Sequence, residues 1–472
     1  MTTSAEEVKP MGAETEQFIP STINILTYNV FGLKFIAGYR RERLSEIGRR
    51  LAAHSPVPEI VALQECWTQE DYQSIHHQTK HILPFAKFYY SGIFGGGLAI
   101  LSKWPIIESS MFRYPLNGRP TAFWRGDWYV GKGVACAKIR YGSAVQDVVE
   151  VFCTHLHAPY ESEPHDSYIC HRTAQAWEIA KLMTGAAERG HLVLGLGDFN
   201  MLPLSFAHRL IEGHAPVRDA WRILHPDSSI GTSTHPEEKK RKRVVPTAAF
   251  NITENGAASD NVLNTFRWPK SRQKRLFKGE SITVDDSTPD PNAKRLDYIF
   301  VGEERHLRVA KSTRWEVRSV NVAMTERHPT LGCSLSDHFA VEATISRSSS
   351  NGTFVRGDET SQNSPEIPFY DSVLAMISTY IVRERWQRKS RLAHFLLSVF
   401  VSIACLVAVW WSPRNFASFI LMLVSTLNLS AGVIDGLIGG LFVGSELRAL
   451  KEFQWEIFNA KGLAEAGNLN DP

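Results

Sequence analysis

The chain has 472 residues, which is too many for one ordinary domain, so we expect a large globular body with additional segments. Hydrophobic residues make up 43% of the chain and charged residues 21%, which is ample material for a core. The formal net charge of +3 is small for this length and argues against a protein that coats nucleic acid.

The six cysteines are scattered singly, with no CxxC pair and no spacing typical of a disulfide framework. This pattern predicts reduced thiols in a domain that faces the cytosol. Residues 1–20 are expected to be a flexible N-terminus, because they begin with a polar, partly acidic stretch. That stretch lacks the basic and then apolar pattern of a signal peptide, so we expect that nothing sends the N-terminal body across a membrane.

Short β-rich segments alternate with helical patterns over residues 21–346, which we interpret as one large globular domain. The predicted strands are INILTYNV (23–30), EIVALQE (59–65), GLAILS (97–102), VVEVFCTH (148–155), LVLGLGD (192–198) and LDYIFVG (296–302). Helical periodicity is found at residues 41–54 and 170–183. This mixture predicts a sandwich of helices and strands with a sheet-built core. Residues 226–261, with the basic run EEKKRKR, are predicted to be a solvated insertion loop.

The C-terminal part of the chain differs in composition from this domain. Residues 347–368 are rich in Ser, Gly and Pro and predict a flexible linker, and residues 369–391 form a basic juxtamembrane segment. Residues 392–411 are as long as the roughly 20 apolar residues needed to cross a bilayer, and 416–442 form a second apolar stretch. Only four residues separate them, so 392–443 is predicted to be a transmembrane helical hairpin, followed by a cytosolic tail at 444–472.

Basic residues flank this predicted hairpin on its outer sides. They are Arg383, Arg385, Arg388, Lys389 and Arg391 before it, and Arg448 and Lys451 after it, whereas the connecting loop has only Arg414. The positive-inside rule therefore places both ends and the globular domain in the cytosol. We expect the membrane to be an intracellular one, such as that of the endoplasmic reticulum or mitochondrion. Arg385, Arg388, Lys389 and Arg391 are well placed to contact anionic lipid head groups. For Asp435 a functional role and simple access to water both remain open.

Polar residues follow several of the predicted strands. They are Asn29 in TYNVFGLK, Glu65 in ALQECW, His155 and His157 in THLHAPY, Asp198 and Asn200 in LGDFN, Asp297 in RLDYIF, and Asp337 with His338 in LSDHF. Each alone is typical of a turn, a rim charge or a helix cap. Together they supply hard oxygen ligands that suit Mg²⁺, and zinc-type spacing is absent. Histidines near carboxylates provide the proton transfers that phosphodiester hydrolysis needs.

The order of these motifs resembles that of the endonuclease/exonuclease/phosphatase superfamily over residues 23–345. The resemblance implies an α+β fold, a two-layer, DNase I-like β-sandwich flanked by helices, with the site at one edge of the sheets. It implies that Glu65, with Asn29, binds Mg²⁺, for which Mn²⁺ is a candidate substitute. His338 would act as general base, oriented by Asp297, and Asp337 would support the site or a metal. Asp198 and Asn200 would position water and phosphate, and His155 would stabilise charge on the phosphoryl oxygen.

Within the superfamily, the hairpin and several segments resemble the neutral sphingomyelinase branch, and in particular inositol phosphosphingolipid phospholipases C. The segments are LTYNVFGLK, GGGLAILSKWPI, NGRPTAFWRGDWYVGKG, THLHAPY and CHRTAQAW. This resemblance implies Mg²⁺-dependent cleavage of sphingophospholipids between ceramide and the phosphorylated head group, with anionic phospholipids as activators and no nucleic-acid partner.

Further substrate contacts are expected from Lys103, Arg119 and His157. GGGLAILSK lacks the GK[ST] ending of a Walker A motif, so it does not predict nucleotide binding. The aromatic residues Phe123, Trp124, Trp128 and Tyr129 fit contact with the head group or bilayer, and core packing explains them equally well.

Three other functions are alternatives for a sequence with these features. A DNA-repair nuclease would need a broad basic face and no membrane hairpin. An inositol polyphosphate 5-phosphatase, or another phosphoinositide phosphatase, is closer in substrate, but the CDR-containing motif expected there is replaced by RLDY. A catalytically inactive membrane scaffold that binds lipid should have lost ligands, yet every expected polar position is occupied.

Overall fold

Two six-stranded sheets pack face to face and carry the catalytic edge. The computed structural model describes residues 19–144, 146–161, 166–302, 313–349 and 366–468. The first sheet has the strand order β11-β12-β1-β2-β4-β3 and the second β5-β6-β7-β8-β10-β9. The first contains β1 (Thr22–Asn29), β2 (Ile60–Gln64), β3 (Phe85–Tyr89), β4 (Leu98–Ser102), β11 (Thr313–Ala323) and β12 (Ala340–Ser349). The second contains β5 (Ile106–Arg113), β6 (Gly133–Arg140), β7 (Val148–His155), β8 (Leu192–Asp198), β9 (Val217–Asp219) and β10 (Asp297–Gly302).

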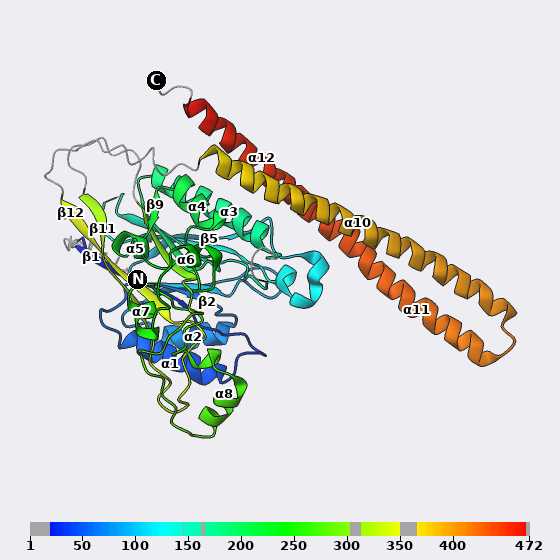
Figure 1. Cartoon of the computed structure of the whole chain (residues 1–472), viewed down its shortest axis with the longest axis horizontal. Helices are drawn as coiled ribbons and strands as arrows, with labels where there is room; N and C mark the ends of the chain where they lie inside the picture. The colour runs from blue at the N-terminus through cyan, green and yellow to red at the C-terminus, as the bar shows by residue number, and fades with distance from the viewer. Residues whose placement is uncertain (1–18, 145, 162–165, 303–312, 350–365, 469–472) are drawn as a thin grey trace, which may run out of the picture.

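Helices cover the outer face of each sheet, so the predicted two-layer sandwich flanked by helices is confirmed (Figure 1). α1 (Arg40–Ala52) and α2 (Gln69–Thr79) pack on the first sheet, and α3 (Ile169–Glu188) and α4 (Phe206–His214) pack on the second. Shorter helices follow: α5 (Ala220–Leu224), α6 (Pro236–Lys240), α7 (Ala248–Thr253) and α8 (Lys270–Phe277). The 3₁₀ segments η1 (Pro120–Arg125), η2 (Asp127–Tyr129) and η3 (Thr265–Arg267) lie in loops.

The strands form because their side chains alternate between two buried faces. In β1, Ile23 and Ile25 enter the cluster between the sheets, whereas Leu26 and Tyr28 enter the cluster under α1. The six strands predicted from the sequence all form, and β3, β5, β6, β9, β11 and β12 complete the sheets. The stretch 226–261 is not the plain loop we expected. It contains α6 and α7, and the buried Asn251 donates to the Asp290 carbonyl at 2.8 Å.

The C-terminal helices form one long arm that projects from the sandwich (Figure 1). α10 (Ile367–Ala408) runs on through η4 (Val409–Trp411), and α11 (Asn415–Leu437) returns through the π-helical segment η5 (Ile438–Phe442) into α12 (Val443–Asn468). Both long helices are apolar enough to cross a membrane. The predicted cytosolic tail, residues 444–472, is helical as far as Asn468 because it belongs to α12. Apolar side chains of α10 and α12 pack against Trp177 of α3, so the arm is joined to the domain.

Polar contacts hold α10 and α11 together along the arm. Asn428 Nδ2 donates to the Ser398 carbonyl at 3.0 Å, and the hydroxyls of Ser402 and Ser425 lie 3.1 Å apart. Asp435 forms ion pairs with Arg391 and His394 of α10. An ionisable group near a bilayer is tolerated when it is paired, and this pairing accounts for Asp435.

Candidate active site

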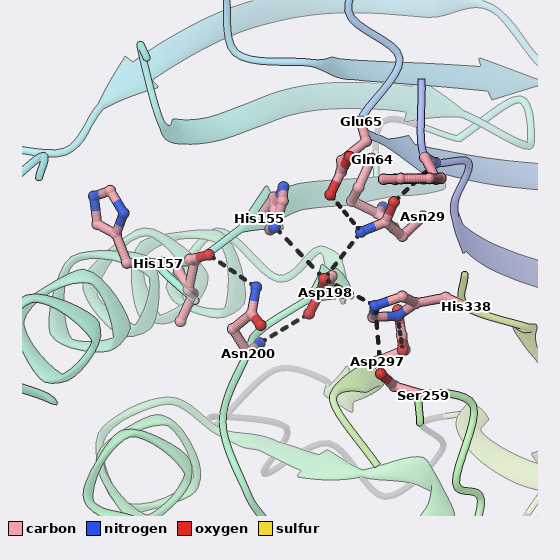
Figure 2. A network of polar contacts seen from close by, with 12 residues as sticks. Asn29, Gln64, Glu65, His155, His157, Asp198, Asn200, Ser259, Asp297 and His338 are labelled. Atoms are coloured by element: carbon pink, nitrogen blue, oxygen red, sulfur yellow. Dashed lines mark hydrogen bonds and ion pairs between the residues drawn. The ribbon is translucent and has the colours of Figure 1, made fainter. Parts of the chain in front are cut away.

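The ends of five strands bring the predicted polar residues together at one edge of the sandwich. In the second sheet, Asp198 at the end of β8 is in register with His155 of β7 and with Asp297 of β10. In the first sheet, Asn29 ends β1 beside the end of β2, and Glu65 follows β2 directly. Figure 2 shows these side chains directed toward one another.

Asn29 links the two sheets through its amide. Nδ2 lies 3.2 Å from Glu65 Oε1 and 3.0 Å from Asp198 Oδ2, while Asn29 Oδ1 accepts from the Phe31 amide at 3.1 Å. Glu65 has a φ of 56°, a left-handed conformation that is rare outside glycine and that directs its carboxylate toward this edge. Burial, helped by the neighbouring charge of Asp337, raises the pKa of Glu65 to about 7.

Asp198 occupies the centre of the cluster and is almost fully buried. Its Oδ1 accepts from the Asn200 amide at 2.9 Å, and Asn200 in turn donates its Nδ2 to the Leu156 carbonyl at 3.1 Å. Burial raises the pKa of Asp198 to about 6, although His338 opposes the shift. These contacts fix the carboxylate between the two histidines.

His338 and Asp297 form a buried pair. Nδ1 of His338 lies 2.8 Å from Asp297 Oδ2, and its Nε2 lies 3.5 Å from the Ser259 hydroxyl and 3.9 Å from Asp198 Oδ2. Burial alone would lower the pKa of His338, but the carboxylates of Asp297 and Asp198 outweigh it and hold the pKa well above the usual value. The imidazole is thus oriented by one carboxylate and faces a second.

His155 lies on the other side of Asp198, with Nε2 3.5 Å from Asp198 Oδ2. Burial, with the nearby Lys132 charge, holds the pKa of His155 well below its ordinary value. His155 is therefore a neutral imidazole that can donate a hydrogen bond. The pKa values of the two histidines shift in opposite directions because His338 has a carboxylate at 2.8 Å, whereas the nearest carboxylate oxygen to His155 lies at 3.5 Å.

The donor set fits a divalent cation. Asp198, Asp297 and His338 offer ligand atoms within 4.8 Å of one another. Glu65 Oε2 and Asp297 Oδ1 are buried and have no hydrogen-bond partner among the described residues, which is costly unless a cation or water satisfies them. Oxygen ligands of this kind favour a hard divalent metal ion. Asp337 lies close enough to raise the pKa of Glu65 and adds to the negative charge of this region.

Three predicted substrate contacts do not join the cluster, and these expectations are corrected. Lys103 follows the end of β4, which runs antiparallel to β2, so it lies at the opposite sheet edge and pairs with Glu59 at 2.8 Å. His157 is fully buried and contacts the rings of Tyr168 and His171. In Figure 2 its ring is directed away from Asp198.

Arg119 lies beside the interface with the C-terminal helices rather than at the phosphate site. Its charge acts on His171, on Glu384 of α10 and on Glu446 of α12. His171 Nε2 and Glu446 Oε1 lie 3.1 Å apart in this buried interface. Arg119 therefore lies near the docking contact of the arm, because all three of these groups belong to that contact.

Two residues of the site were missed by the sequence interpretation. Lys132, just before β6, is buried and donates Nζ to the His155 and Leu156 carbonyls at 3.3 and 3.2 Å. Burial lowers the pKa of Lys132, and the charges of Asp127, Glu65 and Asp198 oppose that shift. The signal was a lysine between two glycines at a strand start. Ser259 had no signal, because its contact with His338 spans 79 residues.

Similarity to known proteins identifies the family of the chain. Residues 26–338 match the model of the Endonuclease/Exonuclease/phosphatase family. The chain belongs to this family. The match begins in β1 and ends at His338, so it includes Asn29, Glu65 and Asp198.

Two relatives within the family align along almost the whole chain. One is "Inositol phosphosphingolipids phospholipase C" of Schizosaccharomyces pombe, 37% identical over 95% of this chain and 97% of its own length. Another is the protein of the same name from Saccharomyces cerevisiae, 31% identical over 93% and 90%. The chain is thus a member of a phosphodiester-hydrolase branch of the family.

The chain also resembles a solved structure, "Sphingomyelinase C from Streptomyces griseocarneus". The TM-score is 0.42 and the identity 17%, over 68% of this chain and 99% of that one.

Proposed function

We propose that the protein is a Mg²⁺-dependent phospholipase C that hydrolyses sphingophospholipids, with an inositol phosphate or choline phosphate head group, to ceramide and the phosphorylated head group. The observation that carries this proposal is the buried His338–Asp297 pair facing Asp198, with Glu65 linked to Asp198 through the Asn29 amide. The names of the two full-length relatives supply the lipid class. An inactive scaffold would have no reason to keep this buried, costly set of carboxylates and histidines.

The residues divide the hydrolysis among them. Asp198 and Asn200 position a water molecule. A dication bound beside the carboxylates would lower the pKa of His338, and His338 in its neutral form accepts the proton of that water as the oxygen attacks phosphorus. Asp297 stabilises the imidazolium that results. The bond from phosphorus to the ceramide oxygen breaks, that oxygen takes a proton from solvent, and the imidazolium of His338 returns its proton to solvent. His155, which is neutral, donates a hydrogen bond to the phosphoryl oxygen, and Lys132 holds the backbone that follows β7.

Glu65 and Asn29 are the residues we assign to Mg²⁺ (with Mn²⁺ as a substitute), supported by Asp337. The unpartnered Glu65 Oε2 is the structural feature that supports this assignment. A bound dication would polarise the phosphoryl oxygen and offset the carboxylate charge around His338.

The membrane arrangement belongs to the same proposal. The hairpin of α10 and α11 would span an intracellular membrane, of the endoplasmic reticulum or mitochondrion, with the catalytic domain on the cytosolic side. Arg385, Arg388 and Lys389 are exposed on α10 and line a groove with Arg448 and Lys451 of α12, which suits anionic phospholipid activators. Arg391 is corrected here: it pairs with Asp435 and is not free to contact a head group.

A direct assay tests the function. Purified protein in anionic mixed micelles should release ceramide from inositol phosphosphingolipid or sphingomyelin in the presence of Mg²⁺, and chelator should abolish the release. His338→Ala and Glu65→Ala should each lose most activity. Full activity of either variant would overturn the site assignment, and no ceramide from either lipid would overturn the proposed function.

A further inference from the structure

The loops at the catalytic edge carry large apolar side chains in solvent. Phe35 and Ile36, in the loop after β1, are 92% and 73% exposed. Ile93, between β3 and β4, is 72% exposed, and Trp124, in η1 between β5 and β6, is 70% exposed. Side chains of this kind gathered at one site mark an interaction surface. We call these four residues, together with Phe94 and Phe123, the apolar rim.

Strand direction places all three loops at the catalytic edge. The loop after β1 follows Asn29 and is held to the site by the Gly32 amide, which donates to the Glu65 carbonyl at 3.0 Å. The loop between β3 and β4 ends where the Cys66 amide donates to the Gly97 carbonyl at 3.0 Å. The loop between β5 and β6 ends at Lys132, which contacts the His155 carbonyl. The rim therefore lies at the same edge of the sandwich as the residues that carry the chemistry.

Two of these loops are bonded to each other. The Gly131 amide donates to the Gly95 carbonyl at 2.9 Å, and the Phe94 amide donates to the Tyr129 carbonyl at 3.3 Å. The rings of Phe94 and Tyr129 also lie 5.9 Å apart. Ile93 and Trp124 are consequently carried by one supported surface and not by two independent loops.

The same surface continues into the base of the hairpin. Trp128 stacks on Phe442 of η5, with ring centroids 4.3 Å apart. Arg391 Nη2 donates to the Thr121 carbonyl in η1 at 3.1 Å. Arg391 directly precedes the apolar stretch of α10, and Phe442 ends that of the second stretch. The rim thus adjoins the level at which the hairpin would enter a bilayer, and in Figure 1 the η1 region (cyan) lies beside the arm.

We propose that the apolar rim inserts into the leaflet from which the hairpin emerges, so that the catalytic edge lies against the bilayer and a lipid reaches it without crossing water. This inference rests on the proposed function and assigns a second membrane contact beyond the hairpin. A bilayer is the partner because continuity with the hairpin base leaves this edge facing lipid. Apolar and aromatic side chains next to a membrane anchor are typical of such a contact.

The test separates membrane access from chemistry. Two double variants are compared with the unmodified protein: Phe35→Ser/Ile36→Ser and Ile93→Ser/Trp124→Ser. Each is assayed on long-chain substrate in phosphatidylcholine/phosphatidylserine vesicles. Each is also assayed on a short-chain analogue below its critical micelle concentration. We expect kcat/KM on vesicles to fall by about tenfold or more, and turnover of the soluble analogue to change by less than about twofold. Phe35→Leu/Ile36→Leu, which keeps the apolar character, should retain vesicle activity.

The matched control lies at the opposite sheet edge. Val57, before β2, and Ile107, at the start of β5, are 48% and 46% exposed. Val57→Ser/Ile107→Ser should leave both activities unchanged. Undiminished vesicle activity in both rim variants, or equal losses on the two substrates, would overturn the proposal. Failure of the unmodified protein on both substrates would instead contradict the proposed function.

Discussion

Nδ1 of His338 lies 2.8 Å from Oδ2 of Asp297, and both side chains are buried. His338 comes from the segment before β12 in one sheet and Asp297 from the start of β10 in the other. The pair thus depends on the packing of the sandwich. It fixes the imidazole so that Nε2 faces Asp198.

Asp297→Asn removes the charge of this pair while keeping its shape. We expect kcat to fall by about 10²–10⁴-fold, because the imidazolium formed during proton transfer loses its stabilising carboxylate. Ceramide release under saturating Mg²⁺ measures the effect, and the thermal midpoint should change little. Asp285→Asn, at an exposed aspartate, is the control and should keep full activity. A kcat within twofold of the unmodified protein would show that Asp297 does not orient the base.

The Mg²⁺ concentration needed for half-maximal activity should rise as the pH falls. Burial raises the pKa of Glu65 to about 7 and that of Asp198 to about 6, so both carboxylates take up protons as the pH falls from 8 to 6. Protons then compete with the cation, because Glu65 binds it only when deprotonated and the charge of deprotonated Asp198 favours the cation from nearby. We expect half-maximal activity to need about tenfold or more Mg²⁺ at pH 6 than at pH 8. The measurement is a Mg²⁺ titration of initial rate at each pH, and equal requirements would contradict the role of these carboxylates in binding.

Lys132, which sequence alone did not indicate as a site residue, should be needed for full activity. Its ammonium group is buried against the His155 and Leu156 carbonyls, near Glu65 and Asp198. Lys132→Met keeps the length of the side chain but leaves two carboxylates without a neighbouring cation, and we expect kcat/KM to fall by about tenfold or more. Lys138→Met, at a lysine that pairs with Glu108 on the other end of β6, should be close to neutral. Comparable activity in the two variants would remove Lys132 from the site.

Most of the site could be predicted because its residues end strands. A carboxylate or amide directly after a buried strand lies at a sheet edge whichever way the sheets pack, and this holds for Asn29, Glu65 and Asp198. The order of the motifs supplied the rest. The position of such a side chain can be predicted from local sequence, because the residue and the strand that it ends are adjacent in the chain.

The errors came from strand direction and from distant contacts. Lys103 also ends a strand, but β4 is antiparallel to β2, and that pairing is not encoded near Lys103. His157 lies two residues after His155, yet its ring turns into the interface with α3. The predicted contact of Arg391 with lipid head groups is wrong because Arg391 pairs with Asp435, which is 44 residues away in the sequence. Each error involves a partner that only the tertiary fold supplies.

The close approach of α10 and α11 gives the last prediction. A Cβ at Gly432 would clash with the Ser398 Cβ, so Gly432→Leu should force the helices apart and weaken the Asn428–Ser398 and Ser402–Ser425 contacts. Ser402→Cys/Ser425→Cys, in a Cys405→Ala background, should form a disulfide in the membrane-embedded protein, because the two hydroxyls lie 3.1 Å apart. We expect Gly432→Leu to reduce this cross-link severalfold. Gly444→Leu is the control, since nothing lies within 4 Å of a Cβ at that position. Equal cross-linking in the two variants would mean that the helices do not pack closely at Gly432.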